Sequence, residues 1–272
     1  METKQLASIP ETMLITLWAR ATETMRPDAL LKDDYAVEMI KKVDYDFSKF
    51  KKAKASQAGV CIRAKLIDEE TLKFLAEHPD AVVIQLGAGI DARYQRLKCP
   101  DVTHWYDLDL EEVIDIRREL IPETDKNTCL ALSLFDYRWL DEVKRHQKPI
   151  LIIAEGVLMY FEERQVRELL NEICMQLEKA TLVFDMLAFA AVRNAKHHDT
   201  VGKMANRAEF LWSELHTKDM EQWNSRIHLA CEYYMSDHDQ GRYPLLLRLL
   251  CKLPVGYRRF NQRVVRLEIH RH

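Results

Sequence analysis

Apolar segments that alternate with amphipathic ones organise the middle of the chain. Five apolar segments are predicted to be strands, at residues 81–86, 102–107, 128–133, 149–154 and 181–186. The run Ile150-Leu151-Ile152-Ile153-Ala154 has no polar face, so this strand is expected to be buried on both sides. The pattern therefore predicts an α/β fold with a mostly parallel sheet that helices cover on both faces.

Helical periodicity marks the segments between and around these strands. The clearest helix is predicted over 162–178, where apolar residues form one stripe. Before the sheet, helices are expected within 11–43, with a break near Pro27 and a second helix from Ala36 to Lys42. A polar loop is expected over 44–56, and another helix from about Val60 to Leu75. Residues 188–228 read as helical. The alternation of apolar residues within 257–269 predicts a final antiparallel hairpin.

Composition narrows the class of protein. The 272 residues are 47% hydrophobic and 31% charged, which is ordinary for a globular chain. The net charge of −3 and the shortness of the basic clusters at 49–54 and 258–259 predict no nucleic-acid partner, and both clusters are interpreted as solvated surface. No window of about 18 uninterrupted apolar residues is present, so no membrane span or membrane partner is expected.

Cysteine and histidine usage gives no sign of a disulfide framework or a metal. None of the six cysteines forms a Cys-x-x-Cys pair, and no signal peptide precedes the fold, so a reduced cytoplasmic protein is predicted. Paired histidines at 197–198 and near the C-terminus lack a second ligand pair at useful spacing, so no metal is expected.

A glycine turn after the first strand carries the strongest functional signal. The chain has 7 glycines, and Gly87 and Gly89 stand two residues apart at the end of Val-Val-Ile-Gln-Leu. About twenty residues later the second strand ends in Asp107-Leu108-Asp109. Glycine lets the backbone approach a ligand, and a carboxylate accepts hydrogen bonds from ribose hydroxyls. These segments predict a pocket for an adenosine-containing cofactor.

The other strand ends also carry acidic residues. Asp136 follows the third strand, Glu155 follows the fourth, and Asp185 lies at the end of the fifth. In an open α/β sheet the ligand lies beyond the carboxyl ends of the strands, so these acids are expected to surround it. For Asp136 and Asp185, capping of a helix remains an alternative.

The spacing Gly87-x-Gly89-x-x-Ala92 alone fits either a dinucleotide or a methyl donor. Asp91 stands near the position where a pyrophosphate would bind, and like charge is unfavourable there. A crevice surrounded by carboxylates suits a cationic cofactor. S-adenosylmethionine carries a sulfonium and an ammonium group and no phosphate, so we favour it.

Three strings make the interpretation specific: Leu-Gly-Ala-Gly-Ile-Asp-Ala-Arg-Tyr-Gln-Arg-Leu at 86–97, Trp-Tyr-Asp-Leu-Asp-Leu at 105–110 and Ala-Glu-Gly-Val-Leu-Met-Tyr-Phe at 154–161. With Thr-Leu-Trp-Ala-Arg-Ala at 16–21, they resemble the leucine carboxyl methyltransferase family and its bacterial branch of tetracenomycin-type polyketide O-methyltransferases. The resemblance covers about residues 12–186. It implies a class I S-adenosylmethionine-dependent methyltransferase with a Rossmann-like sheet, and S-adenosylhomocysteine as a product.

The same resemblance assigns the sugar and methionine contacts. It implies that Gly87, Ala88 and Gly89 lie against the methionine part of the donor and that Asp109 binds the ribose. Alternation along the strand places Asp107 on the same side as Asp109. The choice of Asp109 over Asp107 therefore depends on the resemblance.

The remaining donor contacts are implied in the same way. Ser133 and Leu134 would flank the adenine, and Glu155 would lie beside the donor's ammonium group. Arg63 would hold the donor's carboxylate, for which a guanidinium is suited, and Arg20 is a weaker candidate near the same place. A surface arginine on a helix is the alternative for Arg63.

Tyr160 and His216 are the candidate residues for contacting the acceptor and assisting catalysis. A hydroxyl acceptor would benefit from a base, whereas a carboxylate acceptor would need none. For His216 a surface position is the alternative. Aromatic residues that would form either an acceptor pocket or ordinary core are Trp18, Phe210, Trp212, Trp223, Tyr233 and Tyr234.

One domain, 1–272, is expected, with a helical cap at 1–78, a cofactor-binding core at 79–186, a helical acceptor lid at 187–245 and C-terminal strands at 246–272. The predicted function is O-methylation of a hydroxyl or carboxylate on a small, polyketide-like molecule. The alternatives are a protein C-terminal carboxyl methyltransferase, an NAD-dependent oxidoreductase and a donor-binding protein without catalysis. The sequence leaves a homodimer open.

Overall fold

The computed structural model describes residues 9–192 and 209–271. The strands are β1 (Val82–Leu86), β2 (His104–Asp109), β3 (Asn127–Ala131), β4 (Ile150–Ala154), β5 (Ala180–Met186), β6 (Ile227–Tyr234) and β7 (Arg263–Ile269). The α-helices are α1 (Glu11–Thr24), α2 (Asp34–Lys42), α3 (Lys54–Glu77), α4 (Arg93–Arg96), α5 (Glu111–Leu120), α6 (Arg138–Lys144), α7 (Glu163–Gln176), α8 (Leu245–Leu250) and α9 (Pro254–Phe260).

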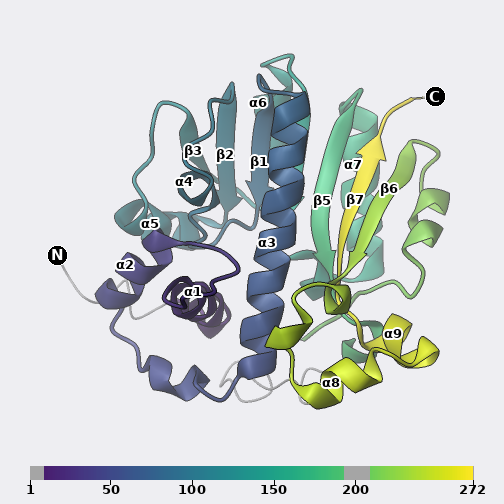
Figure 1. Ribbon diagram of the computed structural model, residues 1–272. Coiled ribbons are helices and arrows are strands. Elements are labelled where there is room, and N and C mark those ends of the chain that lie inside the picture. Colours follow the sequence, from purple (N-terminus) through teal and green to yellow (C-terminus); the bar gives the residue numbers. More distant parts are fainter. Residues whose placement is uncertain (1–8, 193–208, 272) are drawn as a thin grey trace.

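The strands form one sheet in the order β3-β2-β1-β4-β5-β7-β6 (Figure 1). Strands β1 to β5 are parallel to their neighbours, and β7 runs antiparallel to both β5 and β6. The chain changes direction across the sheet between β1 and β4. A crevice therefore opens beyond the carboxyl ends of these two strands, where ligands bind in such folds. The mostly parallel sheet predicted from the sequence is confirmed.

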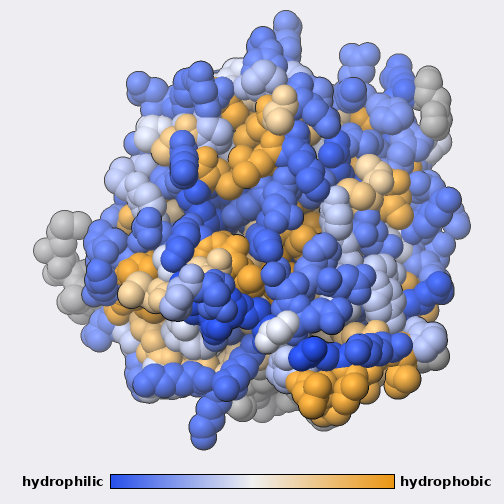
Figure 2. Space-filling model, in the orientation of Figure 1, coloured by the Kyte–Doolittle hydropathy of each residue, from blue (hydrophilic) through white to orange (hydrophobic). Residues whose placement is uncertain are grey.

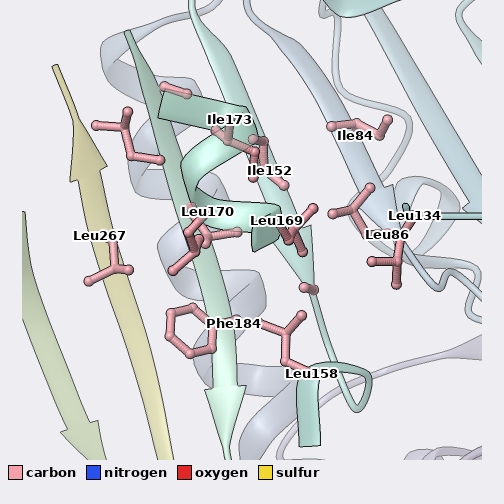
Figure 3. Close-up of a cluster of buried hydrophobic side chains, with 14 of the residues drawn as sticks. Ile84, Leu86, Leu134, Ile152, Leu158, Leu169, Leu170, Ile173, Phe184 and Leu267 are labelled. Atoms are coloured by element: carbon pink, nitrogen blue, oxygen red, sulfur yellow. The ribbon is translucent and has the colours of Figure 1, made fainter. Parts of the chain in front are cut away.

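Helices cover both faces of the sheet, as the apolar strands predict. On one face, Ile84 and Ile152 pack against Leu169 and Ile173 of α7 (Figure 3). On the other face, Val83 and the alternate residues of β4 pack against α3, which crosses in front of the sheet in Figure 1. Burial of each large aliphatic side chain stabilises the fold by roughly 1.5–3 kcal/mol.

A third apolar cluster joins the N-terminal helices to the sheet. Leu17 of α1, Met39 of α2 and Phe50 of the 3₁₀ turn η2 (Phe47–Phe50) are buried together with Ile90, which follows the glycine turn. The cap formed by α1 and α2 therefore packs directly beside the loop that the sequence assigns to the cofactor. Helix α3 begins at Lys54, inside the segment 44–56 predicted as a loop.

The predicted helical lid over 187–245 is wrong for most of the residues that can be described. Short 3₁₀ turns occur at η4 (Phe189–Ala191), η7 (Thr217–Gln222), η8 (Met235–Asp237) and η9 (Gln240–Arg242), and 209–216 contain no helix. Residues 227–234 form strand β6 instead. Residues 193–208 of the predicted lid lie outside the described residues.

The C-terminal strand pairs with a different segment from the one predicted for the final hairpin. Only β7 lies within 246–272, and its hairpin partner is β6, about thirty residues earlier in the chain. Residues 257–260, assigned to the hairpin, belong to α9. Pro254 occupies the first turn of this helix, where its fixed φ and missing N–H are tolerated. The local sequence thus starts a helix where alternation suggested a strand.

Candidate active site

A cavity of 740 Å³ lies beyond the carboxyl ends of β1, β2 and β4. At one end it is lined by the glycine turn, Asp109, Ser133, Leu134 and Glu155. At the other end it is lined by Tyr160, Phe210, Tyr243, Arg248, Cys251, Phe260, Asn261 and Gln262. Side chains of α1 and α3 lie along its length. One continuous space can therefore hold a cofactor and a second molecule.

The glycine turn after β1 adopts a backbone conformation that other residues rarely accept. Gly87 has φ of 63° and Gly89 has φ of 51°, both in the left-handed region. A Cβ atom at Gly87 would overlap the side chain of Val157. The backbone N–H of Gly89 donates to Asp109 Oδ2 over 2.8 Å, so the ends of β1 and β2 are joined at the cavity. Both glycines and Ala88 line the cavity.

The two acids at the end of β2 have different surroundings. Asp107 is 1% exposed and accepts hydrogen bonds from Arg117 at 2.6 Å and from Asn127 at 2.8 Å, so its oxygens are used in the core. Asp109 lines the cavity, and among the described residues it accepts only from the backbone N–H groups of Gly89 and Leu110. A carboxylate has about four acceptor positions, so Asp109 retains capacity for two ribose hydroxyls.

Burial raises the pKa of Asp109 above its ordinary value, although the backbone N–H groups of Gly89 and Leu110 act in the opposite direction. Asp109 makes no ion pair within the part of the chain that the structure describes. A partly desolvated carboxylate without a cationic partner is costly unless a ligand donates to it.

Arg63 connects the ends of β4 and β5. Its Nε lies 3.0 Å from Glu155, and its Nη1 lies 3.1 Å from Asp185. Burial acts to raise the pKa of Glu155, but the positive charges of Arg93 and Arg63 outweigh it and the pKa is lowered. Burial raises the pKa of Asp185 despite Arg63. Gly156, with φ of 69°, donates its N–H to Asp185.

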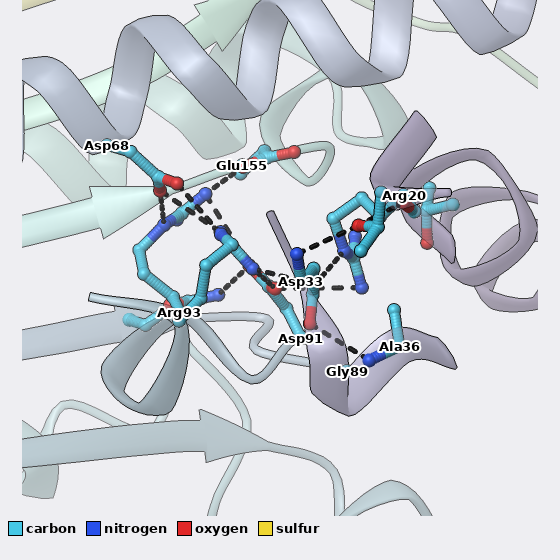
Figure 4. A network of polar contacts seen from close by, with 12 residues as sticks. Arg20, Asp33, Ala36, Asp68, Gly89, Asp91, Arg93 and Glu155 are labelled. Carbon is cyan, nitrogen blue, oxygen red and sulfur yellow. Dashed lines mark hydrogen bonds and ion pairs between the residues drawn. The ribbon is translucent and has the colours of Figure 1, made fainter. Parts of the chain in front are cut away.

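A larger network of ion pairs extends from Glu155 to the cap (Figure 4). Arg93 pairs with Asp68 and Glu155, and Arg96 pairs with Asp33 and Asp68. Asp91 lies within ion-pair distance of all three of Arg20, Arg93 and Arg96. Burial would raise the pKa of Asp91, but these three arginines hold it well below its ordinary value.

This network corrects the expectation that unpaired carboxylates surround the crevice. Asp91, Glu155 and Asp185 each have arginine partners, so their charges are largely neutralised. The charge of Asp91 alone is thus a weaker argument against a pyrophosphate than the sequence suggested. Arg20 Nη2 is buried, lies 3.6 Å from Asp91 and makes no hydrogen bond to another described residue, and Arg20 also lines the cavity. This group is available to an anionic part of a ligand.

The loop after β3 contributes Ser133 and Leu134 to the cavity wall, as predicted. Leu134 is buried, and the Ser133 hydroxyl accepts a hydrogen bond from the N–H of Phe135. Asp136, which is two residues further on, is paired with Arg138 on the surface and does not line the cavity. It therefore plays no part in this site.

Of the two candidate acceptor residues, only Tyr160 lies at the cavity. It ends η3 (Leu158–Tyr160), and its ring lies 5.8 Å from that of Phe210. Burial raises the pKa of Tyr160 above its ordinary value of 10.0. The structure does not bring His216 to the cavity, because the segment before η7 is a bend rather than the expected helix and leaves His216 exposed.

Most of the aromatic residues predicted to form an acceptor pocket lie elsewhere, in the core or half-buried beside it. Trp18 packs on Phe50, Trp212 packs between Phe184 and Trp223, Tyr233 hydrogen-bonds to Glu70, and Tyr234 stacks on Tyr257. Among the predicted aromatic residues, Phe210 alone lines the cavity. The acceptor end instead uses α8 and α9, which the sequence analysis missed. Arg248, the single charged residue within Leu-Leu-Leu-Arg-Leu-Leu, was a signal that could have pointed to α8 as part of the acceptor end.

Solved structures share this architecture. An S-adenosylmethionine-dependent methyltransferase from Anabaena variabilis superposes with a TM-score of 0.52 at 12% identity, over 77% of this chain and 84% of that chain. The N-methyltransferase NodS from Bradyrhizobium japonicum, in complex with S-adenosylhomocysteine, gives 0.50 at 11% identity, over 87% and 99%. The protein therefore has the fold of class I methyltransferases.

Sequence similarity identifies the family. Residues 13–174 match the family described as Leucine carboxyl methyltransferase. The chain is 36% identical over 220 residues to the tetracenomycin polyketide synthesis O-methyltransferase TcmP of Streptomyces glaucescens, covering 81% of this chain and 80% of that protein. It is 30% identical to the S-adenosylmethionine-dependent methyltransferase dpfgK of Gibberella zeae, over 62% of this chain and 61% of that protein.

The chain belongs to the leucine carboxyl methyltransferase family. It is an S-adenosylmethionine-dependent methyltransferase, as the glycine turn and the three strings predicted. The alternative of an NAD-dependent oxidoreductase is set aside.

Proposed function

We propose that the enzyme transfers a methyl group to an oxygen atom of a small molecule bound in the α8–α9 half of the cavity. The observation that carries this proposal is the continuity of the 740 Å³ cavity from Asp109 to Arg248. The similarity to a polyketide O-methyltransferase over four-fifths of the chain supports it. The enclosing walls come from α1, α3, α8 and α9.

The residues at the first end fit S-adenosylmethionine. Gly87 and Gly89 both have positive φ, Gly87 leaves no room for a Cβ atom beside Val157, and Asp109 keeps free acceptor positions. Arg20 Nη2 makes no hydrogen bond to another described residue, and Arg20 and Arg63 both line the cavity, so they fit the donor's carboxylate, and Glu155 would lie near the ammonium group. When bound, the donor supplies an already activated methyl group, so the protein chiefly has to position the acceptor.

Tyr160 is placed to orient the acceptor oxygen rather than to remove its proton. Tyr160 lines the cavity, and burial raises its pKa, so it stays protonated at neutral pH. A protonated phenol donates a hydrogen bond and is a poor base. This arrangement favours acceptors that are already ionised, such as a carboxylate or an acidic phenol.

Arg248 would select for an anionic or carbonyl group at the far end of the acceptor. Its Nε is buried and makes no hydrogen bond, and its side chain lines the cavity. A buried unpaired donor costs about 1–3 kcal/mol, which a bound oxygen atom would relieve. The proposed acceptor is therefore an apolar small molecule with oxygen groups at two positions.

A panel of aromatic hydroxy acids and a carboxyl-terminal peptide, each incubated with donor carrying a labelled methyl group, tests this proposal. Mass spectrometry should find the label on small acids or phenols, with no label when Gly87→Ala enzyme is used. Labelling of the peptide carboxylate alone would favour the protein carboxyl methyltransferase. Donor binding without any labelled product would favour a protein that has lost catalysis. Cytoplasmic location and dimerisation stay predictions.

A further inference from the structure

The surface of α8 and α9 exposes an unusual number of large apolar side chains. The exposed fractions are 66% for Leu245, 71% for Leu246, 52% for Leu249, 59% for Leu253 and 45% for Phe260. Figure 2 shows them as an orange patch over α8 and α9, bordered by blue hydrophilic residues. We call these five residues the α8–α9 surface.

No other part of the described chain gathers such residues. Met25, Tyr35, Leu72, Leu110 and Met175 are the other exposed large apolar residues among those described, and they belong to different parts of the fold. Scattered apolar residues are normal on a protein surface, whereas a contiguous patch marks an interaction site. The α8–α9 surface therefore needs a partner.

The charge around this surface has one sign. The 28 residues from Gln240 to Leu267 contain seven arginines or lysines and no acidic residue. Arg248, Lys252, Arg258 and Arg259 lie on or between the two helices and form no ion pair with another described residue. This part of the molecule is cationic although the whole chain carries a net charge of −3.

We propose that the α8–α9 surface binds the surface of a membrane that contains anionic phospholipid. Exposed leucines with adjacent lysines and arginines are the combination that inserts at a lipid–water interface, because the apolar groups enter the acyl region and the cations meet the headgroups. This binding is peripheral: no helix in the described ranges is both long and apolar enough to cross a membrane. It departs from the prediction that Arg258 and Arg259 are plain solvated surface.

The charge distribution argues against two other partners. A second copy of the chain, docked through the same surface about a two-fold axis, would bring two cationic surfaces into contact, which is unfavourable. A nucleic acid would engage the arginines but would leave the five apolar side chains in water. Anionic lipid satisfies both the apolar and the cationic groups.

The position of this surface connects membrane binding to the cavity. Phe260 belongs to the α8–α9 surface and also lines the cavity. Arg248 and Cys251, from the same part of the chain, line the cavity as well. If the proposed function is correct, a lipophilic acceptor dissolved in the bilayer would reach the cavity without crossing water. Membrane binding itself does not depend on turnover and is tested separately.

Co-sedimentation with vesicles of phosphatidylcholine, alone or mixed with phosphatidylglycerol, tests the proposal with the full-length enzyme. We expect binding to the mixed vesicles, much weaker binding to phosphatidylcholine alone, and weaker binding at high salt. Leu246→Glu should abolish binding. Met175→Glu, at an equally exposed methionine on α7, should leave it unchanged. Melting temperature and S-adenosylhomocysteine affinity report that both variants are folded.

A double variant with Arg258→Gln and Arg259→Gln measures the contribution of positive charge to vesicle binding. Each basic residue near an anionic surface strengthens binding about fivefold, so the double variant should bind roughly twentyfold more weakly. Arg164→Gln on α7 is the exposed control. Absence of binding to the mixed vesicles, or equal binding by the Leu246→Glu and Met175→Glu enzymes, overturns the proposal. A dimer that Leu246→Glu converts to a monomer, without vesicle binding, would overturn it in favour of a second copy.

Discussion

Asp107 and Asp109 are two residues apart on one strand, and their neighbours give them opposite roles. Arg117 and Asn127 use the oxygens of Asp107 inside the core, whereas Asp109 receives only backbone N–H groups and faces the cavity. An acid that is paired in the core stabilises the fold, and one that keeps free acceptor positions can bind a ligand. The structure thus supports the choice of Asp109 for the ribose.

Replacement of Asp109 by alanine should weaken S-adenosylhomocysteine binding at least about tenfold. Two charge-assisted hydrogen bonds to the ribose would be lost, each contributing about 1.5–3 kcal/mol. Isothermal titration calorimetry measures the change. Asp136→Ala, which removes an exposed carboxylate after the next strand, is the control and should bind normally. Normal affinity of the Asp109→Ala enzyme would refute the assigned role.

Donor affinity should also depend on pH through Asp109. Burial raises the pKa of Asp109, so protonation begins at a higher pH than for an ordinary aspartate of pKa 3.8. Only the ionised carboxylate accepts from both ribose hydroxyls with full strength. Affinity for S-adenosylhomocysteine should therefore rise with pH through this raised pKa and then level off. The Asp109→Asn enzyme should lack this rise in a calorimetric pH series.

Replacement of Tyr160 by phenylalanine should lower kcat about tenfold or more while donor affinity stays within twofold. The phenol is expected to orient the acceptor through a hydrogen bond, and a hydrogen bond to a charged group contributes about 1.5–3 kcal/mol. Because burial raises the pKa of Tyr160, the wild-type kcat should show no ionisation of this residue between neutral pH and pH 9. Steady-state kinetics across that range provide the measurement, with Tyr137→Phe, outside the cavity, as the control.

At the scale of elements, the turn after β1 depends on two residues that lack a side chain. Gly87→Ala should lower the free energy of unfolding by about 2 kcal/mol and prevent donor binding. The left-handed conformation costs roughly 1–2 kcal/mol for a residue with a Cβ, and that atom would overlap Val157. Gly241→Ala meets no atom within 4 Å and should change stability by less than about 0.5 kcal/mol. Urea unfolding compares the two.

The sequence predicted the elements that carry a local apolar pattern and missed those that depend on distant partners. All five parallel strands and α7 were found, because their apolar runs and stripes are local signals. Strand β6 was mistaken for part of a helical lid, since Ile227 to Tyr234 are mostly half-buried and pair with β7 far along the chain. The expected position of His216 at the cavity depended on that helical lid. Arg248 was missed although its place within an apolar run was a usable signal, because the local sequence does not position α8 at the cavity.

At the scale of the whole molecule, buried ion pairs tie the cap to the sheet. Arg20 of α1, Asp33 before α2, Asp68 of α3 and Arg96 of α4 meet beside Asp91. Buried pairs of this kind add little stability compared with apolar packing, but loss of one partner leaves an uncompensated charge. Residues 9–77 therefore dock in one geometry next to the donor end of the cavity.

Asp33→Asn should destabilise the protein by about 3–5 kcal/mol, because Arg20 and Arg96 lose a fully buried partner. The amide oxygen can still accept from the N–H of Ala36, so the effect reports the charge rather than the helix cap. Asp46→Asn, at an exposed cap of η2, should cost less than about 1 kcal/mol. Equal losses in a denaturant titration would contradict the network's role.

Strand β7 is last in the sequence, yet it lies inside the sheet between β5 and β6. During synthesis the residues of β6 emerge before those of β7 and have no neighbouring strand in the sheet until β7 has emerged. Loss of residues 263–269 would therefore remove an interior strand and detach β6, whereas an edge strand could be lost with less harm. Assembly of this side of the sheet should wait for the synthesis of β7.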